Sequence, residues 1–187
     1  MAATVITICN GALTLIGADR IQSLDDDTAE AAACKALYEP TRDAVLAEHP
    51  WSCTLFRSTL ALSSSTPNWG YNYEFPLPTS PRYLQMVDFY EGYPYTIEGG
   101  KLLTDSYTAR IKYSGVQEDT TLYPPLLAEL ISVRLAAELP YDLNGSQDAI
   151  QRLWAMYKEK LDDAKKSDMR QDNEPIYIND SWIDARN

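Results

Sequence analysis

Hydrophobic and polar positions alternate with a helical period at both ends of the chain and with a shorter period in the middle. Apolar residues recur at helical spacing over residues 4–16. They recur again from residue 29, after three aspartates and Thr28. Thr4 and Thr28 are suited to cap these two helices, and Gly17 is suited to close the first one in a left-handed conformation. Gly11 weakens the first helix but permits another backbone to approach it closely. The N-terminal part is therefore predicted to be helical.

The second helix contains the most informative stretch of the chain, the run from Tyr38 to Trp51. Pro40 lies inside a helical pattern. Because proline removes a helical hydrogen bond and clashes with the preceding turn, we expect a kink or break over residues 36–39. The pattern resumes after Pro40 and stops before Pro50. The run predicts a helix that bends, continues and then passes the chain to a β region anchored by Trp51.

The sequence pattern in the middle of the chain predicts short strands separated by turns. Alternating residues predict strands over residues 54–62, 71–75, 82–90, 95–98, 101–103 and 109–113. Pro76 and Pro78 are expected to end the second of these strands. Gly99 and Gly100 form a hairpin signal between the fourth and the fifth. This region is predicted to be a small β unit inserted between helices.

The pattern returns to helix after residue 114. Pro124 and Pro125 suit a first helical turn, and the helix that they begin is expected to run to Pro140. The clearest amphipathic stripe follows, and it consists of Ile150, Leu153, Trp154, Tyr157, Leu161 and Ala164. Beyond Lys166 the sequence becomes polar. These patterns together predict an α+β fold: an antiparallel helical bundle (1–50 and 115–167) with an inserted small antiparallel β domain (51–114) and an extended C-terminal tail (168–187).

The predicted C-terminal arm has an unusual composition for a solvated tail. Such tails carry few aromatic or β-branched residues, whereas this one contains Ile176, Tyr177, Ile178, Trp182 and Ile183. Two interpretations remain open. The arm folds back on its own domain, or it docks on another subunit or partner, with these five residues as its partner-binding contacts.

Charge and composition narrow the class of protein. The net charge of −11 argues against binding that neutralises DNA phosphates, which needs an excess of Lys and Arg. An acidic wall could still let DNA slide past it, because like charges repel. The sequence has no apolar run long enough to cross a bilayer, and its first residues lack the basic start of a secretory signal. We therefore expect no membrane association and synthesis in the cytoplasm.

Chemistry-bearing residues are sparse. His49 is the only histidine, and its place at a helix end favours a structural role, since the helix dipole stabilises an imidazolium there. A hydrolase would have to depend on this residue. The three cysteines, Cys9, Cys34 and Cys53, have no metal-ligand spacing, and the first two are interpreted as small buried hydrophobes. The tyrosines of the β region are surrounded by Glu, Asp and Pro rather than by Lys and Arg, so this region fits a protein interface better than a nucleic-acid interface. We expect no enzymatic activity, no cofactor and no metal.

Several short sequence segments, taken in their order along the chain, resemble those of the tail tubular protein A family of bacteriophage head-to-tail adaptors. They are Cys9-Asn10-Gly11-Ala12-Leu13 with Ile16-Gly17, Ile21-Gln22-Ser23-Leu24-Asp25, Ala32-Ala33-Cys34, Tyr38 with Arg42-Asp43 and Leu46, His49-Pro50-Trp51, Arg57 with Leu60-Ala61-Leu62, and Tyr71, Tyr73 and Pro76-Leu77-Pro78. The likeness extends over residues 5 to 90 and is only architectural after that. One departure is Ser52-Cys53 after the Pro-Trp, where the family pattern has an aromatic residue sooner than Phe56.

The resemblance implies a structural protein of the virion neck, assembled in the host cytoplasm. Such proteins form a homo-oligomeric ring, commonly of twelve subunits, beneath the portal protein. They support the tail tube or nozzle protein and extend a channel through which DNA passes without sequence-specific binding. The positions of structural importance in this sequence are Pro40, Arg42, Asp43, His49, Pro50 and Trp51. The alternative is an acidic monomeric protein-binding or regulatory module without enzymatic activity.

Overall fold

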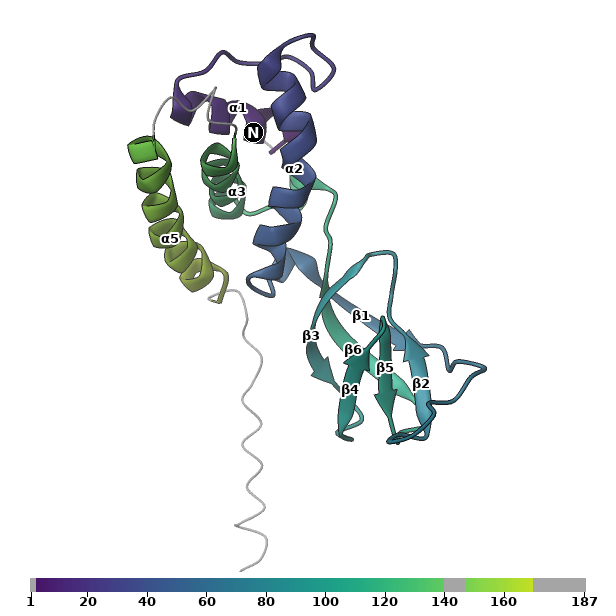
Figure 1. Ribbon diagram of the computed structural model, residues 1–187. Coiled ribbons are helices and arrows are strands. Elements are labelled where there is room, and N and C mark those ends of the chain that lie inside the picture. Colours follow the sequence, from purple (N-terminus) through teal and green to yellow (C-terminus); the bar gives the residue numbers. More distant parts are fainter. Residues whose placement is uncertain (1–2, 140–146, 170–187) are drawn as a thin grey trace, which may run out of the picture.

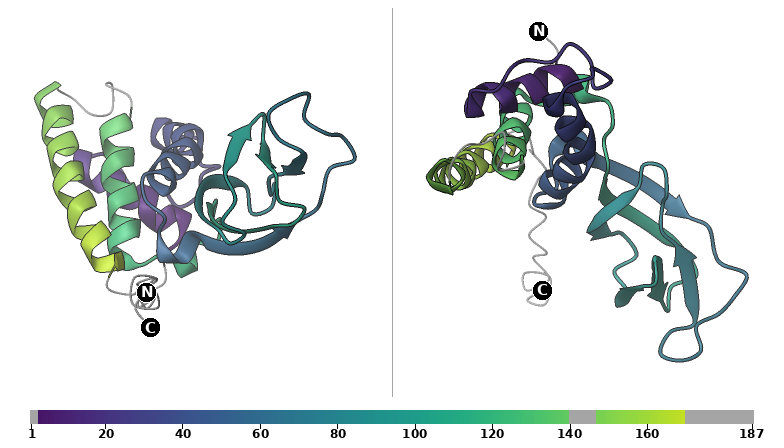
Figure 2. Two further views of the ribbon diagram at one scale, coloured as in Figure 1. Left: turned by 90° about the horizontal axis from the view of Figure 1, so that it is seen from below. Right: turned by 45° about the horizontal axis from the view of Figure 1, so that its top comes forward.

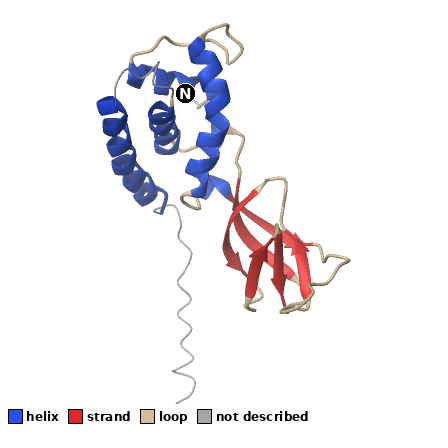
Figure 3. Cartoon of the chain, viewed as in Figure 1, coloured by secondary structure: helices blue, strands red, loops and turns tan. Residues whose placement is uncertain are grey.

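The computed structural model describes residues 3–139 and 147–169 and shows an α+β architecture (Figures 1 and 3). Its helices are α1 (Val5–Ile16), α2 (Ala29–Ala47), α3 (Pro125–Glu138) and α5 (Gln147–Met169). Two short 3₁₀ turns, η1 (Ser52–Thr54) and η2 (Thr120–Leu122), lie at the passages between the helices and the strands. None of the helices in the described ranges has the length and apolar character that a membrane span requires.

The strands form two small antiparallel sheets. One sheet has the order β1-β6-β3, built from Leu55–Leu60, Ala109–Gly115 and Tyr83–Phe89. The other has the order β2-β5-β4, built from Tyr73–Pro76, Lys101–Thr104 and Tyr95–Glu98. Gly99 and Gly100 both have positive φ and turn β4 into β5, as the sequence predicts. The two sheets enclose a core made of Leu60, Phe75, Phe89, Leu102, Ala109, Ile111 and Tyr113.

The helices pack around α3. Helix α3 contacts α1, α2 and α5, and its buried residues include Leu127, Leu130, Ile131 and Leu135. Cys9 and Cys34 are fully buried in this core, as predicted. The neighbouring Cys34 thiol, together with burial, raises the pKa of Cys9 well above its usual range. The helical core is separate from the β core, and the β module projects from one end of the helical body (Figures 1 and 2).

Local signals in the sequence explain the helix ends. The Thr4 side chain accepts from the backbone N–H of Thr7, and Thr28 does the same for Ala31. Gly17 closes α1 with φ 75°, and its N–H bonds the last turn. Gly11 faces α3, where a Cβ at this position would lie 2.9 Å from Ser132 Oγ. The close helix contact expected at Gly11 is confirmed.

Two expectations need correction. The break predicted at Pro40 is absent, because α2 is a single helix from Ala29 to Ala47 with Pro40 on its exposed side; the kink over residues 36–39 stays a prediction. The sequence predicts that the C-terminal arm begins at residue 168, whereas α5 continues to Met169 and Asp168 is a buried residue of that helix. The five predicted contacts of the arm, Ile176, Tyr177, Ile178, Trp182 and Ile183, lie outside the described residues.

Candidate functional site

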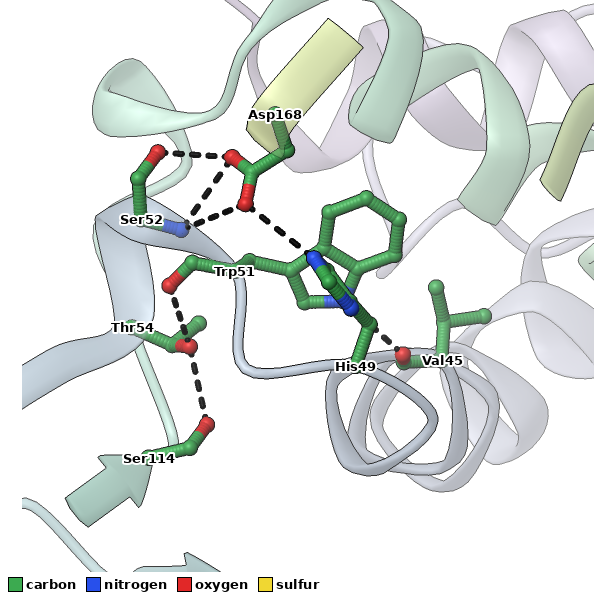
Figure 4. A network of polar contacts seen from close by, with 7 residues as sticks. All are labelled: Val45, His49, Trp51, Ser52, Thr54, Ser114 and Asp168. Carbon is green, nitrogen blue, oxygen red and sulfur yellow. Dashed lines mark hydrogen bonds and ion pairs between the residues drawn. The ribbon is translucent and has the colours of Figure 1, made fainter. Parts of the chain in front are cut away.

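The candidate site is the junction where the helical body passes the chain to the β module (Figure 4). Helix α2 ends there, η1 leads into β1, and the last turn of α5 lies beside them. Strand β6 brings the chain back from the β module at the same place. The junction therefore joins four elements that are distant in the sequence.

Trp51 anchors the junction. Its side chain is only 1 % exposed, and its indole Nε1 donates to the carbonyl of Val45 in the last turn of α2 at 3.1 Å. The same carbonyl accepts from the backbone N–H of Glu48 at 3.2 Å, so the indole supplies its second hydrogen bond. The His49 ring packs edge-on against the Trp51 ring, with centroids 4.8 Å apart. Burial of the indole and this pair hold the chain reversal at Pro50 in one geometry.

Asp168 ties α5 to the other side of Trp51. Its carboxylate accepts from the backbone N–H of Ser52 at 3.0 and 3.1 Å and from Ser52 Oγ at 2.7 Å. His49 Nε2 lies 3.3 Å from Asp168 Oδ2. The carboxylate is buried, and each of its oxygens has a donor, which is the condition for a stable buried charge (Figure 4).

A hydrogen bond between two buried hydroxyl groups links the start of β1 to the end of β6. Thr54 Oγ1 donates to the carbonyl of Trp51 at 2.8 Å and lies 2.8 Å from Ser114 Oγ. Thr54 and Ser114 are fully buried, and Ser114 is opposite Leu55 in the register of β1 and β6. The two crossings between helical body and β module are thereby fixed to each other.

A second contact holds β3 to α2. Arg42 is buried and donates from Nε to Asp43 Oδ1 at 2.9 Å, while Arg82, just before β3, forms an ion pair with Asp43 Oδ2. Burial works against the charge of Arg42, but the Asp43 carboxylate outweighs it and raises the pKa of Arg42. A polar groove of about 490 Å³ lies along this chain of residues, between α2 and residues 79–82 and 116–118.

The order of the side chains bears on catalysis. In a Ser-His-Asp triad the histidine stands between the serine and the carboxylate, so that it takes the serine proton. Here Asp168 stands between Ser52 and His49, and Ser52 donates to the carboxylate. The geometry is that of a carboxylate that orients two donors. Within residues 3–139 and 147–169, no group of three His, Cys, Asp or Glu side chains is placed to hold a metal ion.

The predicted structural residues meet at this junction with one exception. His49, Pro50 and Trp51 form its centre, and Arg42 and Asp43 form its second contact. Pro40 lies on the exposed side of α2. Sequence reasoning missed Asp168, although its spacing from Leu161 and Ala164 continues the amphipathic stripe of α5. It also missed Ser52, Arg82 and Ser114, whose roles depend on contacts between distant segments.

The β module carries a set of exposed aromatic side chains away from the junction. They are Trp69 (86 % exposed), Tyr90, Tyr93, Tyr95 and Tyr107. Residues 51–114 contain five Lys or Arg and five Asp or Glu, so the β module is neutral and the remainder of the chain carries the whole charge of −11. Aromatic side chains are enriched at protein interfaces.

Comparison with known proteins gave no match, either to the models of protein families or among curated proteins.

Proposed function

We propose that this chain is a structural head-to-tail adaptor of a bacteriophage, which forms a ring that joins the portal to the tail and extends the DNA channel. The observation that carries the proposal is the junction. The run from Tyr38 to Trp51 resembles the adaptor family most clearly, and the end of the same run holds a projecting β module on a helical body through buried, hydrogen-bonded contacts. An adaptor needs two binding units held at a fixed angle.

The charge distribution supports this assignment. An acidic helical body fits a channel wall that DNA passes without sticking, because both carry negative charge. The neutral β module with its exposed aromatics fits contact with protein, because aromatic side chains contribute most to such interfaces. In this arrangement the protein is a component of the virion neck and has no catalytic role.

The test is assembly with the portal protein. The purified chain is mixed with portal, and ring-shaped complexes are sought by negative-stain imaging and light scattering. We expect a symmetric ring of this chain on one end of the portal. The isolated chain can be a monomer, because such a ring can assemble on the portal itself. Failure to bind portal, together with absence from purified particles, would overturn the proposal.

A variant pair examines the role of the C-terminal arm. Ile178→Ala with Trp182→Ala removes two apolar contacts, and Asn179→Ala with Ser181→Ala is the matched control in the same segment. If the arm clasps the portal, the first variant weakens portal binding by about tenfold or more, as loss of an aromatic anchor does, and the control binds like the wild type. Equal binding by both variants would remove the arm from the interface.

The alternative function is an acidic monomeric binding or regulatory module. The exposure of Trp69, Tyr90 and Tyr107 favours it, since such surfaces also serve single-partner recognition. A chain that stays monomeric with every virion component, and whose partner binding survives removal of residues 170–187, would support this alternative.

A further inference from the structure

An apolar groove lies where the start of α3 meets the last turns of α5. It has a volume of about 160 Å³, and residues 124–127, two prolines followed by two leucines, line it from the side of α3. Ala164, Ser167 and Asp168 line it from the side of α5, and Trp51 completes the lining. A closed cavity of about 150 Å³ holds a benzene ring. The α3–α5 groove, defined by these residues, therefore has room for one large apolar side chain.

The floor of the groove belongs to the helical core, and its rim is exposed. Trp51 and Leu127 are each 1 % exposed, whereas Leu126 is 42 % exposed. Asp168 is the only charged residue of the lining, and its carboxylate already accepts hydrogen bonds from Ser52 (Figure 4). The groove thus presents apolar surface and no unpaired charge to the solvent, which fits an apolar side chain better than a charged ligand.

We propose that the α3–α5 groove binds the run Ile176–Ile178 of the same chain. Helix α5 ends at Met169, the residue after Asp168 of the lining, and the run contains the first large apolar residues beyond that point. Its composition is Ile-Tyr-Ile, and the nearest carboxylates in the sequence, Glu174 and Asp180, lie outside it. The groove takes up an apolar side chain of the run and leaves these carboxylates in water.

The length of the chain beyond α5 allows the run to return to the groove. Residues 170–175 have the sequence Arg-Gln-Asp-Asn-Glu-Pro and contain Asp, Asn and Pro, which are common in turns. The seven residues from Met169 to Ile176 span up to about 25 Å when extended. Ala164, at the far end of the lining on α5, is about 8 Å from Met169 along the helix. Ile176 can therefore double back and reach the groove.

Attachment to the same chain favours this run over the same run of a second copy. A short flexible linker gives an effective concentration of the order of millimolar, which exceeds that of a protein in dilute solution. The proposal concerns the isolated chain and does not depend on the adaptor function. A portal that binds the arm would compete with the groove for it, and failure of the intramolecular contact and failure to bind portal are separate results.

Hydrogen–deuterium exchange of the full-length chain tests the proposal. In wild type we expect the amides of residues 176–178 to exchange about tenfold or more slowly than those of an unstructured peptide of the same sequence, because burial of one isoleucine side chain stabilises a contact to this extent. Leu126→Asp places a carboxylate at the rim of the groove and should reduce this protection about fivefold or more. The matched control is Leu15→Asp on α1, where the leucine is 43 % exposed and does not line the groove, and protection should stay unchanged.

Variants of the segment keep the test decisive if the groove variant does not fold. Ile176→Ser with Ile178→Ser should lower the protection to a similar extent, whereas Trp182→Ser with Ile183→Ser, outside the run, should leave it unchanged. Absence of protection in wild type overturns the proposal, and so does protection that the folded Leu126→Asp chain or the first segment variant retains. Equal loss in a variant and its control also overturns it. Protection that rises with protein concentration assigns the contact to a second copy and overturns the intramolecular one.

Discussion

Single residues determine how closely the elements of this protein approach each other. Gly11 on α1 faces Ser132 on α3, whose Oγ donates to the carbonyls of Ile8 and Ala128 at 3.0 and 3.1 Å. The hydroxyl thus sits between the two helix backbones. A side chain at position 11 would occupy the space that this hydroxyl needs. The two residues form one packing unit, although 121 positions separate them in the sequence.

Substituting Gly11→Ala is expected to destabilise the protein by about 1–2 kcal/mol. Alanine favours the helix by roughly 1 kcal/mol relative to glycine. Its Cβ would, however, lie 2.9 Å from Ser132 Oγ, and overpacking of this kind costs about 1–3 kcal/mol. Loss of the Ser132 hydrogen bonds adds to this cost. Chemical denaturation of wild type, both single variants and Gly11→Ala with Ser132→Ala measures the coupling. The double variant should be more stable than the sum of the single effects implies, whereas additive effects would show that the two residues do not compete for space.

Glu74 makes the β module sensitive to acid. Its side chain is 7 % exposed, and it accepts from Lys101 Nζ at 2.6 Å and from Ser63 Oγ at 3.0 Å, with a further contact to Ser65. Lys101 first, then the two serine hydroxyls, lower the pKa of Glu74 from 4.5 to about 2 against the effect of burial. The pKa of Glu74 is lower in the folded state than in the unfolded state. Its stabilisation is therefore complete above about pH 4.5 and is lost as the pH falls toward 2.

The melting temperature of the β module should therefore fall as the pH decreases from about 5 to 2, more in wild type than in Glu74→Gln. Circular dichroism at a series of pH values gives both profiles. Glu98→Gln, at an exposed position of the same module, should follow the wild-type profile. Parallel profiles for wild type and Glu74→Gln would contradict the role of this carboxylate.

At the scale of elements, the sequence predicts those features that local pattern determines. The caps at Thr4 and Thr28, the Gly17 stop and the Gly99-Gly100 turn are present because each depends on neighbours within a few residues. The break predicted at Pro40 is absent, and Pro40 lies on the exposed side of α2, away from the packed side. Only part of the candidate site could be predicted from the sequence. The run from residue 42 to 51 identified its centre, whereas the partners Asp168, Arg82 and Ser114 come from other elements. Such contacts are set by tertiary packing and have no local signal.

The last turn of α5 is predicted to depend on Asp168. Replacing Asp168→Asn keeps the shape but removes the charge that accepts from Ser52 and lies beside His49, and hydrogen bonds to charged groups contribute about 1.5–3 kcal/mol. We expect a loss of about 2 kcal/mol in the free energy of unfolding and faster amide exchange over residues 160–169. Asp162→Asn, at an exposed position of α5, is the control and should change neither. An unchanged exchange rate at the end of α5 would show that Trp51 packing alone holds the helix.

The molecule as a whole is electrostatically divided. The helical ranges 3–50, 115–139 and 147–169 contain nine Lys or Arg and seventeen Asp or Glu, whereas the β module is neutral. Ion pairs occur in both units, among them Glu74–Lys101 in the β module and Lys160–Glu129 in the helical body, but only the helical body has an excess of negative charge. In the helical body repulsion between like charges opposes compactness. We therefore expect the stabilities of the two units to respond differently to ionic strength.

Sodium chloride should therefore stabilise the helical body and not the β module. Between about 0.02 and 0.5 M the screening length falls from roughly 20 Å to a few ångströms, which removes repulsion in the helices and weakens ion pairs in the sheets. Hydrogen–deuterium exchange resolves the two units in one experiment: amides of α1, α2 and α3 should exchange more slowly at high salt, and those of β2, β4 and β5 should exchange equally or faster. The variant Asp19→Asn with Asp162→Asn removes two exposed negative charges and should reduce the helical response while leaving that of the sheets unchanged. A salt response of the same sign and size in both units would show that net charge does not limit the stability of the helical body.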